Sequence, residues 1–130
     1  MSKIFLAICL AATTLVIDAS GSALAQSPAG NITVVTIIDV ISNANIPKNV
    51  ESAGALLTKL AADTQQAPGV VSFKILRDAN RTNHFIILGV WKDMKSFDDY
   101  TGVETTRTFR QALQPKLGGP FDERVYIDLK

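Results

Sequence analysis

The strongest structural signal in this chain is the stretch HFIILGVW, residues 84–91. Successive side chains of a strand point to opposite faces of a sheet. One face of this strand would therefore carry Phe85, Ile87 and Trp91, and the other would carry Ile86, Leu88 and Val90. An antiparallel sheet that is covered on one side only has a polar second face. The stretch therefore predicts a strand that is covered on both sides.

Three more strands are predicted around this one. Residues 70–77 are rich in β-branched and aromatic side chains, and residues 78–83, DANRTN, are turn formers, so 70–77 and 84–91 should form an antiparallel hairpin. Residues 32–41 are dense in β-branched residues and predict a strand upstream. Residues 121–129 alternate in polarity and predict the last strand, with Phe121, Val125, Ile127 and Leu129 on one side.

Two helical regions separate these strands. Apolar residues recur at helical spacing within residues 47–66, where Pro47 suits the first turn and Pro68-Gly69 stops the helix. The second region covers residues 94–114, with Asp93 as its N-cap. A break is expected near Thr101-Gly102, because glycine is a poor residue for a helix interior.

The predicted order of elements is β, α, β, β, α, β, which is that of the ferredoxin-like α+β fold. Its four-stranded antiparallel sheet would carry both helices on one face. The second face would also be apolar, since residues 32–41 repeat the pattern, with Val35 and Ile37 opposed by Val34 and Ile38. Monomers rarely expose an apolar patch of this size. We therefore expect a two-fold homodimer in which two sheets face each other and form a barrel-like core.

Composition excludes several classes of protein. The chain has 130 residues, which indicates one domain, and it contains one His and one Cys. These cannot supply a structural zinc site, so no metal site is expected. Lys and Arg number 13 against 12 Asp and Glu, and the net charge of +1 is not concentrated in a basic stripe. A nucleic-acid partner is therefore not expected.

Residues 1–25 have the pattern of a signal peptide. Lys3 precedes an apolar run from Ile4 to Ile17, which is shorter than the roughly 20 residues of a membrane-spanning helix, so no stable membrane anchor is expected. Cleavage is predicted after Ala25, at the end of a stretch of small residues. A single domain, residues 26–130, would then be exported as a periplasmic or secreted protein.

Four stretches carry a resemblance to a known family: PGVVSFKILRD (68–78), RTNHF (81–85), WKD (91–93) and LGGPFDER (117–124). Together they resemble the antibiotic biosynthesis monooxygenase family, which includes small quinol monooxygenases, and the likeness extends from about Ile32 to Tyr126. The resemblance implies a dimeric α+β barrel, in agreement with the argument from the two apolar faces. It also implies oxidation of a quinol or another electron-rich aromatic by dioxygen without metal or flavin cofactor, in a pocket between helices and sheet.

The resemblance also shows which family residues this chain lacks. Many relatives carry a Glu two residues before the tryptophan of the third strand and His residues on the following helix, and here Gly89, Tyr100 and Thr105 stand at these positions. The haem-degrading branch uses an Asn on the first strand, and residues 32–41 contain none. Haem is therefore not expected as a cofactor.

The candidate catalytic groups are Tyr100 and His84, the single histidine. Tyr100 could replace a histidine only if its pKa were lowered, and it could instead pack beside Phe97 on a helix. His84 could titrate near neutral pH or lie at the surface. The candidate substrate-binding residues are Trp91, Phe85 and Gly89.

These binding residues also have structural alternatives. Trp91 could be a core aromatic, and Gly89 could mark a bulge or a close approach; either reading of Gly89 leaves space beside Trp91. No pair of carboxylates suits acid–base catalysis, and Asp122 with Arg124 should form an exposed ion pair. Two functions stay open: a monooxygenase-like enzyme, and a non-catalytic dimeric protein that binds a small apolar ligand on the same scaffold.

Overall fold

A computed structural model describes residues 30–129 of the chain. The predicted signal peptide and its cleavage site lie outside the described residues. In chain order the elements are β1 (Ile32–Asp39), α1 (Asn49–Thr64), β2 (Val70–Arg77), β3 (His84–Trp91), α2 (Met94–Gly102), α3 (Glu104–Leu113), a 3₁₀ turn η1 (Gln114–Lys116) and β4 (Asp122–Ile127). The predicted order is confirmed, and the second helical region divides into α2 and α3 close to the predicted break.

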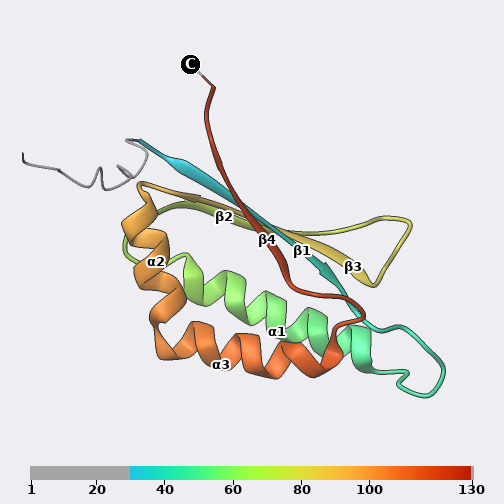
Figure 1. The fold of residues 1–130 in the computed structure, drawn as a ribbon. Coiled ribbons are helices and arrows are strands. Elements are labelled where there is room, and N and C mark those ends of the chain that lie inside the picture. Colours follow the sequence, from blue (N-terminus) through green and yellow to red (C-terminus); the bar gives the residue numbers. More distant parts are fainter. Residues whose placement is uncertain (1–29, 130) are drawn as a thin grey trace, which may run out of the picture.

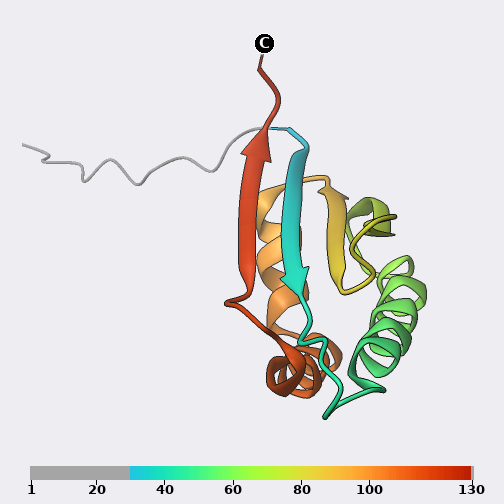
Figure 2. The same cartoon turned by 90° about the vertical axis from the view of Figure 1, so that its right-hand side faces the viewer.

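The strands form one antiparallel sheet in the order β2-β3-β1-β4, and the helices cover one of its faces (Figure 1). Turned by 90°, the same arrangement shows β4 and β1 side by side with the helices behind and beside them (Figure 2). The hairpin of β2 and β3 has the predicted bounds. The ferredoxin-like α+β fold is therefore confirmed for the described part of the chain.

Several element ends differ from the sequence predictions. β1 ends at Asp39 and not at Ile41, because the chain turns away there: Ile41 donates its amide hydrogen bond to the carbonyl of Lys116. The first helix begins at Asn49 and not at Pro47, and the Asn49 side chain donates to the carbonyls of Ile41 and Lys116. These residues therefore bond to distant parts of the chain and do not continue the strand or the helix that the local sequence predicts.

The core lies between the sheet and the helices. β3 presents Phe85, Ile87 and Trp91 to the helices, at 5%, 6% and 1% exposure. The opposite face also follows the prediction: β1 and β3 pair so that Val35 lies beside Leu88. Both residues are only partly buried in the single chain. The sheet therefore has a second apolar face that its own helices do not cover.

β4 departs from the expectation of one apolar side. Val125, Ile127 and Leu129 are 39%, 56% and 99% exposed. β4 is the edge strand beside β1, and its outer half extends beyond the helices (Figure 1). Alternation along a strand therefore identified the faces but not how much of each face the helices reach.

One turn ties the end of α1 to the start of α2. Gly69 has a φ of +81°, a conformation that favours glycine, and a Cβ there would meet the Ser96 side chain at 2.4 Å. Ser96 donates both its amide and its hydroxyl to Asp93, each at 2.7 Å, so Asp93 is the predicted N-cap. Lys92 donates its amide to the Gly69 carbonyl at 2.9 Å. This turn sets the position of α2 against α1.

Candidate active site

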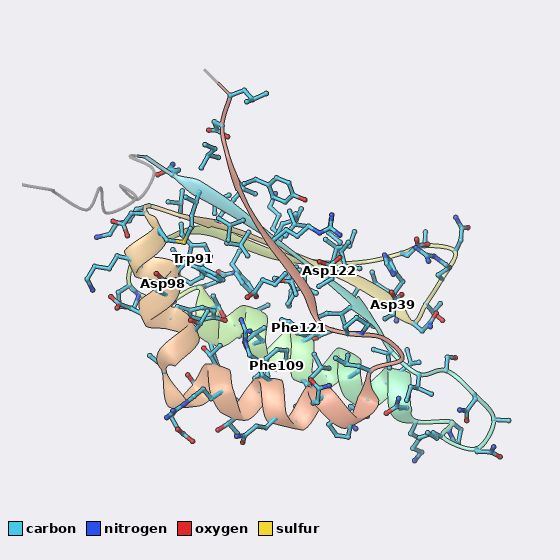
Figure 3. All side chains as sticks on the ribbon, viewed as in Figure 1. Asp39, Trp91, Asp98, Phe109, Phe121 and Asp122 are labelled. Carbon is cyan, nitrogen blue, oxygen red and sulfur yellow. The ribbon has the colours of Figure 1, made fainter. Side chains whose placement is uncertain are left out.

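A small cavity lies between the sheet and the helices. Its volume is about 20 Å³, measured as the space open to the centre of a water molecule. Figure 3 shows Trp91, Phe109 and Phe121 in the layer between the sheet and the helices. The lining residues come from all four strands and all three α-helices: Val34, Thr36, Leu60, Phe73, Ile87, Gly89, Trp91, Phe97, Tyr100, Thr106, Phe109, Arg110, Phe121 and Glu123.

Aromatic rings form one end of the cavity. Trp91, which is 1% exposed, lies with its ring centroid 4.6 Å from that of Tyr100 and 5.8 Å from that of Phe97. The rings are tilted by 39° and 55°. Both distances fall in the range of favourable aromatic pairs. This end is therefore an apolar wall of aromatic rings packed on one another.

The hydroxyl of Tyr100, on α2, forms a hydrogen bond with α1. Its oxygen lies 2.8 Å from Oγ1 of Thr64, which is 1% exposed, so a hydrogen bond joins α2 to α1. Burial raises the pKa of Tyr100 above 10.0, and hydrogen bonds with Thr64 and Thr106 oppose that effect only in part. A base that works near neutral pH needs a lowered pKa, and the surroundings of Tyr100 raise it instead. Tyr100 is therefore a neutral phenol at neutral pH, able to donate a hydrogen bond.

A charged pair also lines the cavity. Arg110, on α3, donates from Nη2 to both carboxylate oxygens of Glu123, on β4, at 3.0 and 2.8 Å. Thr36 donates from Oγ1 to the same carboxylate at 3.3 Å. The Arg110 guanidinium also lies 4.9 Å from the centroid of the Phe121 ring. The cavity is therefore lined by a carboxylate and a guanidinium as well as by aromatic rings.

The sequence analysis did not single out Arg110 or Glu123. A signal for Glu123 exists in the alternation of β4, since it shares a strand face with Phe121 and Val125, and a carboxylate within an apolar row is unusual. Arg110 carries no comparable signal, because arginine is common on exposed helix faces. Only the packing of α3 against the sheet shows that the two meet.

Gly89 lies beside the aromatic end, but not as predicted. A Cβ at this position would be 2.8 Å from Nε1 of Trp91 and 3.4 Å from Cδ2 of Phe73. The space next to Gly89 is therefore filled by the indole itself and is not left open beside it. The lack of a side chain at Gly89 allows the Trp91 indole to lie over this position.

The structure does not bring the remaining predicted residues into the cavity. His84 lies at the start of β3 on the open side of the sheet, where its Nδ1 is 2.6 Å from Oδ1 of Asp39. Phe85 faces the helices and is 5% exposed, but it does not line the cavity. Of the predicted site residues, Tyr100, Trp91 and Gly89 lie together.

The predicted ion pair of Asp122 and Arg124 is present. Asp122 and Arg124 form an ion pair on the exposed edge of the sheet, with distances of 3.0 and 2.9 Å. Within residues 30–129, no three His, Cys, Asp or Glu side chains are grouped so as to hold a metal ion. None of the helices in that part of the chain has the length and apolar character needed to span a membrane.

A larger groove lies outside the cavity, between α1 and the pair α2 and α3. Its volume, measured in the same way, is about 930 Å³. Four residues line both the groove and the inner cavity: Leu60, Tyr100, Thr106 and Phe109. They form a common wall. Thr105 lines the outer groove only.

Comparison with solved structures gives many chains of the same fold. An antibiotic biosynthesis monooxygenase matches with a TM-score of 0.69 and 14% identity, over 76% of this chain and 99% of the other. Rv0793 from Mycobacterium tuberculosis matches with a TM-score of 0.68 and 16% identity, over 77% and 96%. SnoaB, a cofactor-independent oxygenase from Streptomyces nogalater, matches with a TM-score of 0.65 and 18% identity, over 78% and 96%. No curated protein matches the chain by sequence.

The family assignment comes from the sequence comparison. The model of the antibiotic biosynthesis monooxygenase family matches residues 43–112, which extend from the loop after β1 to the last turn of α3. This range contains Trp91, Tyr100 and Arg110. It supports a monooxygenase-like function in general terms. The chain belongs to the antibiotic biosynthesis monooxygenase family.

Proposed function

We propose that this protein is a cofactor-independent monooxygenase that oxidises a quinol or another electron-rich aromatic with dioxygen. The observation that carries the proposal is the presence of aromatic rings and a charged pair in one cavity. Trp91 and Tyr100 form an aromatic wall, and Arg110 with Glu123 forms a charged pair facing the same space. A phenolic substrate fits both parts, because its apolar ring can pack on the aromatic wall and its acidic hydroxyl can bond to the charged pair.

The roles of the residues follow from their chemistry. The Glu123 carboxylate accepts the proton of a substrate hydroxyl, and the Arg110 guanidinium stabilises the oxyanion that is left. The electron-rich anion then reacts with dioxygen beside the aromatic wall, where the bound substrate displaces water. For a dihydroxybenzene the products are a hydroxybenzoquinone and water. The substrate supplies all the electrons, one oxygen atom enters the product and the other leaves as water.

A binding protein without catalysis is the second candidate. Two observations favour it: the pKa of Tyr100 is raised, so Tyr100 does not act as a base, and the family position for a Glu is occupied by Gly89. On this reading the Arg110–Glu123 pair only orients a bound ligand. The two candidates differ in whether oxygen is consumed.

Oxygen uptake separates them. The protein is incubated with a panel of hydroquinones and anthrones in an oxygen electrode, beside a binding titration followed by Trp91 fluorescence. We expect uptake above the buffer rate with at least one compound. Uptake at the buffer rate throughout, together with saturable binding, would instead support the binding protein.

Variants test the assigned residues. Glu123→Gln keeps the shape of the side chain and removes the proton acceptor, and we expect kcat/KM to fall about a hundredfold. Asp122→Asn is the matched control, since it changes the neighbouring carboxylate on the exposed edge of β4. Full activity in Glu123→Gln would show that the proton goes elsewhere.

Assembly and export complete the proposal. The open apolar face of the sheet would be covered by a second copy of the chain, giving a homodimer. Residues 1–25 would direct export and be removed. The mass of the protein recovered from the periplasm or the medium tests the second point: a chain that begins at Gln26 supports it, and an intact chain that stays in the cytoplasm contradicts it.

A further inference from the structure

The inner cavity is too small for the substrate that the proposed function requires. Its volume of about 20 Å³ is close to the room that one water molecule needs. A cavity that takes up benzene has a volume of about 150 Å³. An aromatic ring can therefore enter only if a side chain of the cavity wall moves.

The inner cavity and the outer groove share a wall, so a side chain that moves out of this wall would connect them. Tyr100 lies in this wall, with its ring against Trp91 on the inside and its hydroxyl bonded to Thr64 at the floor of the groove. Leu60, Thr106 and Phe109 are the other shared residues, and they are nearly fully buried in the helix packing, at 8%, 3% and 8% exposure. Tyr100 is only partly buried. It is the wall residue with room to move.

The backbone at Tyr100 is also near a joint. α2 ends two residues later at Gly102, and Val103 is extended, with φ −72° and ψ 150°, before α3 begins. Nothing lies within 4 Å of a Cβ placed on Gly102, so the last turn of α2 faces open space. The backbone just after Tyr100 is therefore not held by packing at Gly102, and an outward movement of Tyr100 has to break its hydrogen bond with Thr64 and its contact with Trp91.

We propose that the hydrogen bond between Tyr100 and Thr64 is a latch that separates the outer groove from the inner cavity, and that the groove receives an uncharged aromatic molecule and passes it inward when the latch opens. The identity of that molecule as substrate rests on the proposed function. The latch itself concerns access, and it applies to any small aromatic ligand.

The rim of the groove favours an uncharged ligand. Its three lysines each lie beside a carboxylate: Lys59 beside Asp63 at 2.5 Å, Lys95 beside Asp99 at 2.6 Å, and Lys92 beside Asp93 at 4.0 Å. The rim therefore offers no free charge of one sign. Val103, which lines the groove, is 45% exposed and adds apolar surface at its entrance.

The single tryptophan reports directly on the latch. Trp91 is the chain's one Trp and is 1% exposed behind Tyr100, so quenching of its fluorescence by acrylamide measures opening. Thr64→Val and Tyr100→Phe break the latch from opposite sides while keeping most of the side-chain volume. We expect each to raise the quenching constant about fivefold, the factor that corresponds to one net hydrogen bond.

Two controls define the result. Thr58→Val removes a threonine hydroxyl from the same helix, where it bonds the Gly54 carbonyl and lines neither space, and it should quench as the unaltered protein does. The double variant Thr64→Val with Tyr100→Phe should quench no more than Tyr100→Phe alone, because Tyr100→Phe already removes the hydroxyl that Thr64 bonds. Quenching unchanged in both latch variants, or raised equally in Thr58→Val, overturns the proposal.

Ligand entry is measured without oxygen, so that its outcome is independent of catalysis. Hydroquinone is mixed with the protein under nitrogen, and the change in Trp91 fluorescence is followed by stopped flow. We expect both latch variants to bind about fivefold faster, and hydroquinone sulfonate to bind far more weakly than hydroquinone. Equal rates in all variants overturn the latch even if the protein consumes oxygen. Faster entry supports the latch even if oxygen uptake is absent.

Discussion

The indole Nε1 of Trp91 lies over the backbone of Gly89, so close that a Cβ at position 89 would be 2.8 Å away. Residues two apart on a strand point to the same face, and the ring of Trp91 folds back over the position where the second side chain would stand. The same ring packs on Tyr100 at 4.6 Å. The position of the Trp91 ring, and with it the aromatic end of the site, therefore requires that residue 89 has no side chain.

Gly89→Ala tests this relationship. We expect a loss of about 1–3 kcal/mol of unfolding free energy, because the added methyl displaces a buried indole. Urea unfolding followed by far-UV circular dichroism measures it. Gly54→Ala is the matched control on α1, where nothing lies within 4 Å, and it should stabilise by about 0.5–1 kcal/mol. Unchanged stability and Trp91 emission in Gly89→Ala would contradict the geometry.

Arg110 and Glu123 should be energetically coupled. Both side chains are partly buried, at 34% and 23% exposure, and Glu123 also accepts a bond from Thr36. In a double-mutant cycle of Arg110→Met and Glu123→Gln we expect a coupling of about 1–2 kcal/mol in unfolding free energy. The pair Asp122 and Arg124, which is exposed, should show no coupling beyond experimental error. Additive effects at Arg110 and Glu123 would mean that the contact between Nη2 of Arg110 and the Glu123 carboxylate is absent in solution.

Tyr100 should ionise only in strongly alkaline solution. Burial raises its pKa above 10.0, so the folded state keeps the proton that the unfolded state begins to lose near pH 10. Its contribution to stability is therefore complete below pH 10 and is lost as the pH rises above that value. The difference in absorbance at 295 nm between the protein and Tyr100→Phe isolates this group. A phenolate signal near pH 8 would contradict the direction of the shift and restore Tyr100 as a base.

Asp93 should make the stability of α2 sensitive to acid. Its pKa is lowered below 3.8, first by the hydroxyl of Ser96 and then by the Ser96 amide, so the folded state favours the carboxylate. This contribution is present above pH 3.8 and is lost as the pH falls through the lowered value. Asp93→Asn keeps an N-cap without the charge. We expect its urea midpoint to lie below that of the unaltered protein at pH 6 and the gap to narrow as the pH falls below 3.8. A difference in urea midpoint that does not change with pH would show that the charge of Asp93 does not cause it.

Leu88→Lys tests the proposed homodimer. Leu88 lies on the open face of the sheet beside Val35, and a charge in the middle of that apolar face should prevent two sheets from packing together. We expect sedimentation velocity to give a dimer for the unaltered protein and a folded monomer for Leu88→Lys. Thr58→Lys, on the exposed side of α1, is the control and should stay dimeric. An unaltered protein that is a well-folded monomer at micromolar concentration would contradict the proposal.

The hairpin shows how much of the fold could be predicted. The bounds of β2 and β3 agree with the sequence analysis, because their residue types and the polar turn between them are local signals. The end of β1 did not agree, since the hydrogen bond from Ile41 to Lys116 joins residues far apart in the chain. The exposure of Ile127 was also not predictable from alternation, because the reach of the helices over an edge strand is set by packing.

By itself the sequence determined which side chains share a face: Trp91 toward the helices, Leu88 away from them, and Gly89 leaving a position without a side chain between the two. These follow from covalent geometry, which fixes the direction of each side chain relative to its neighbours. The contacts of Arg110 with Glu123, and of Tyr100 with Thr64, were decided only by the tertiary structure. Each joins two elements whose relative position depends on how the whole core packs, and no local pattern encodes that position.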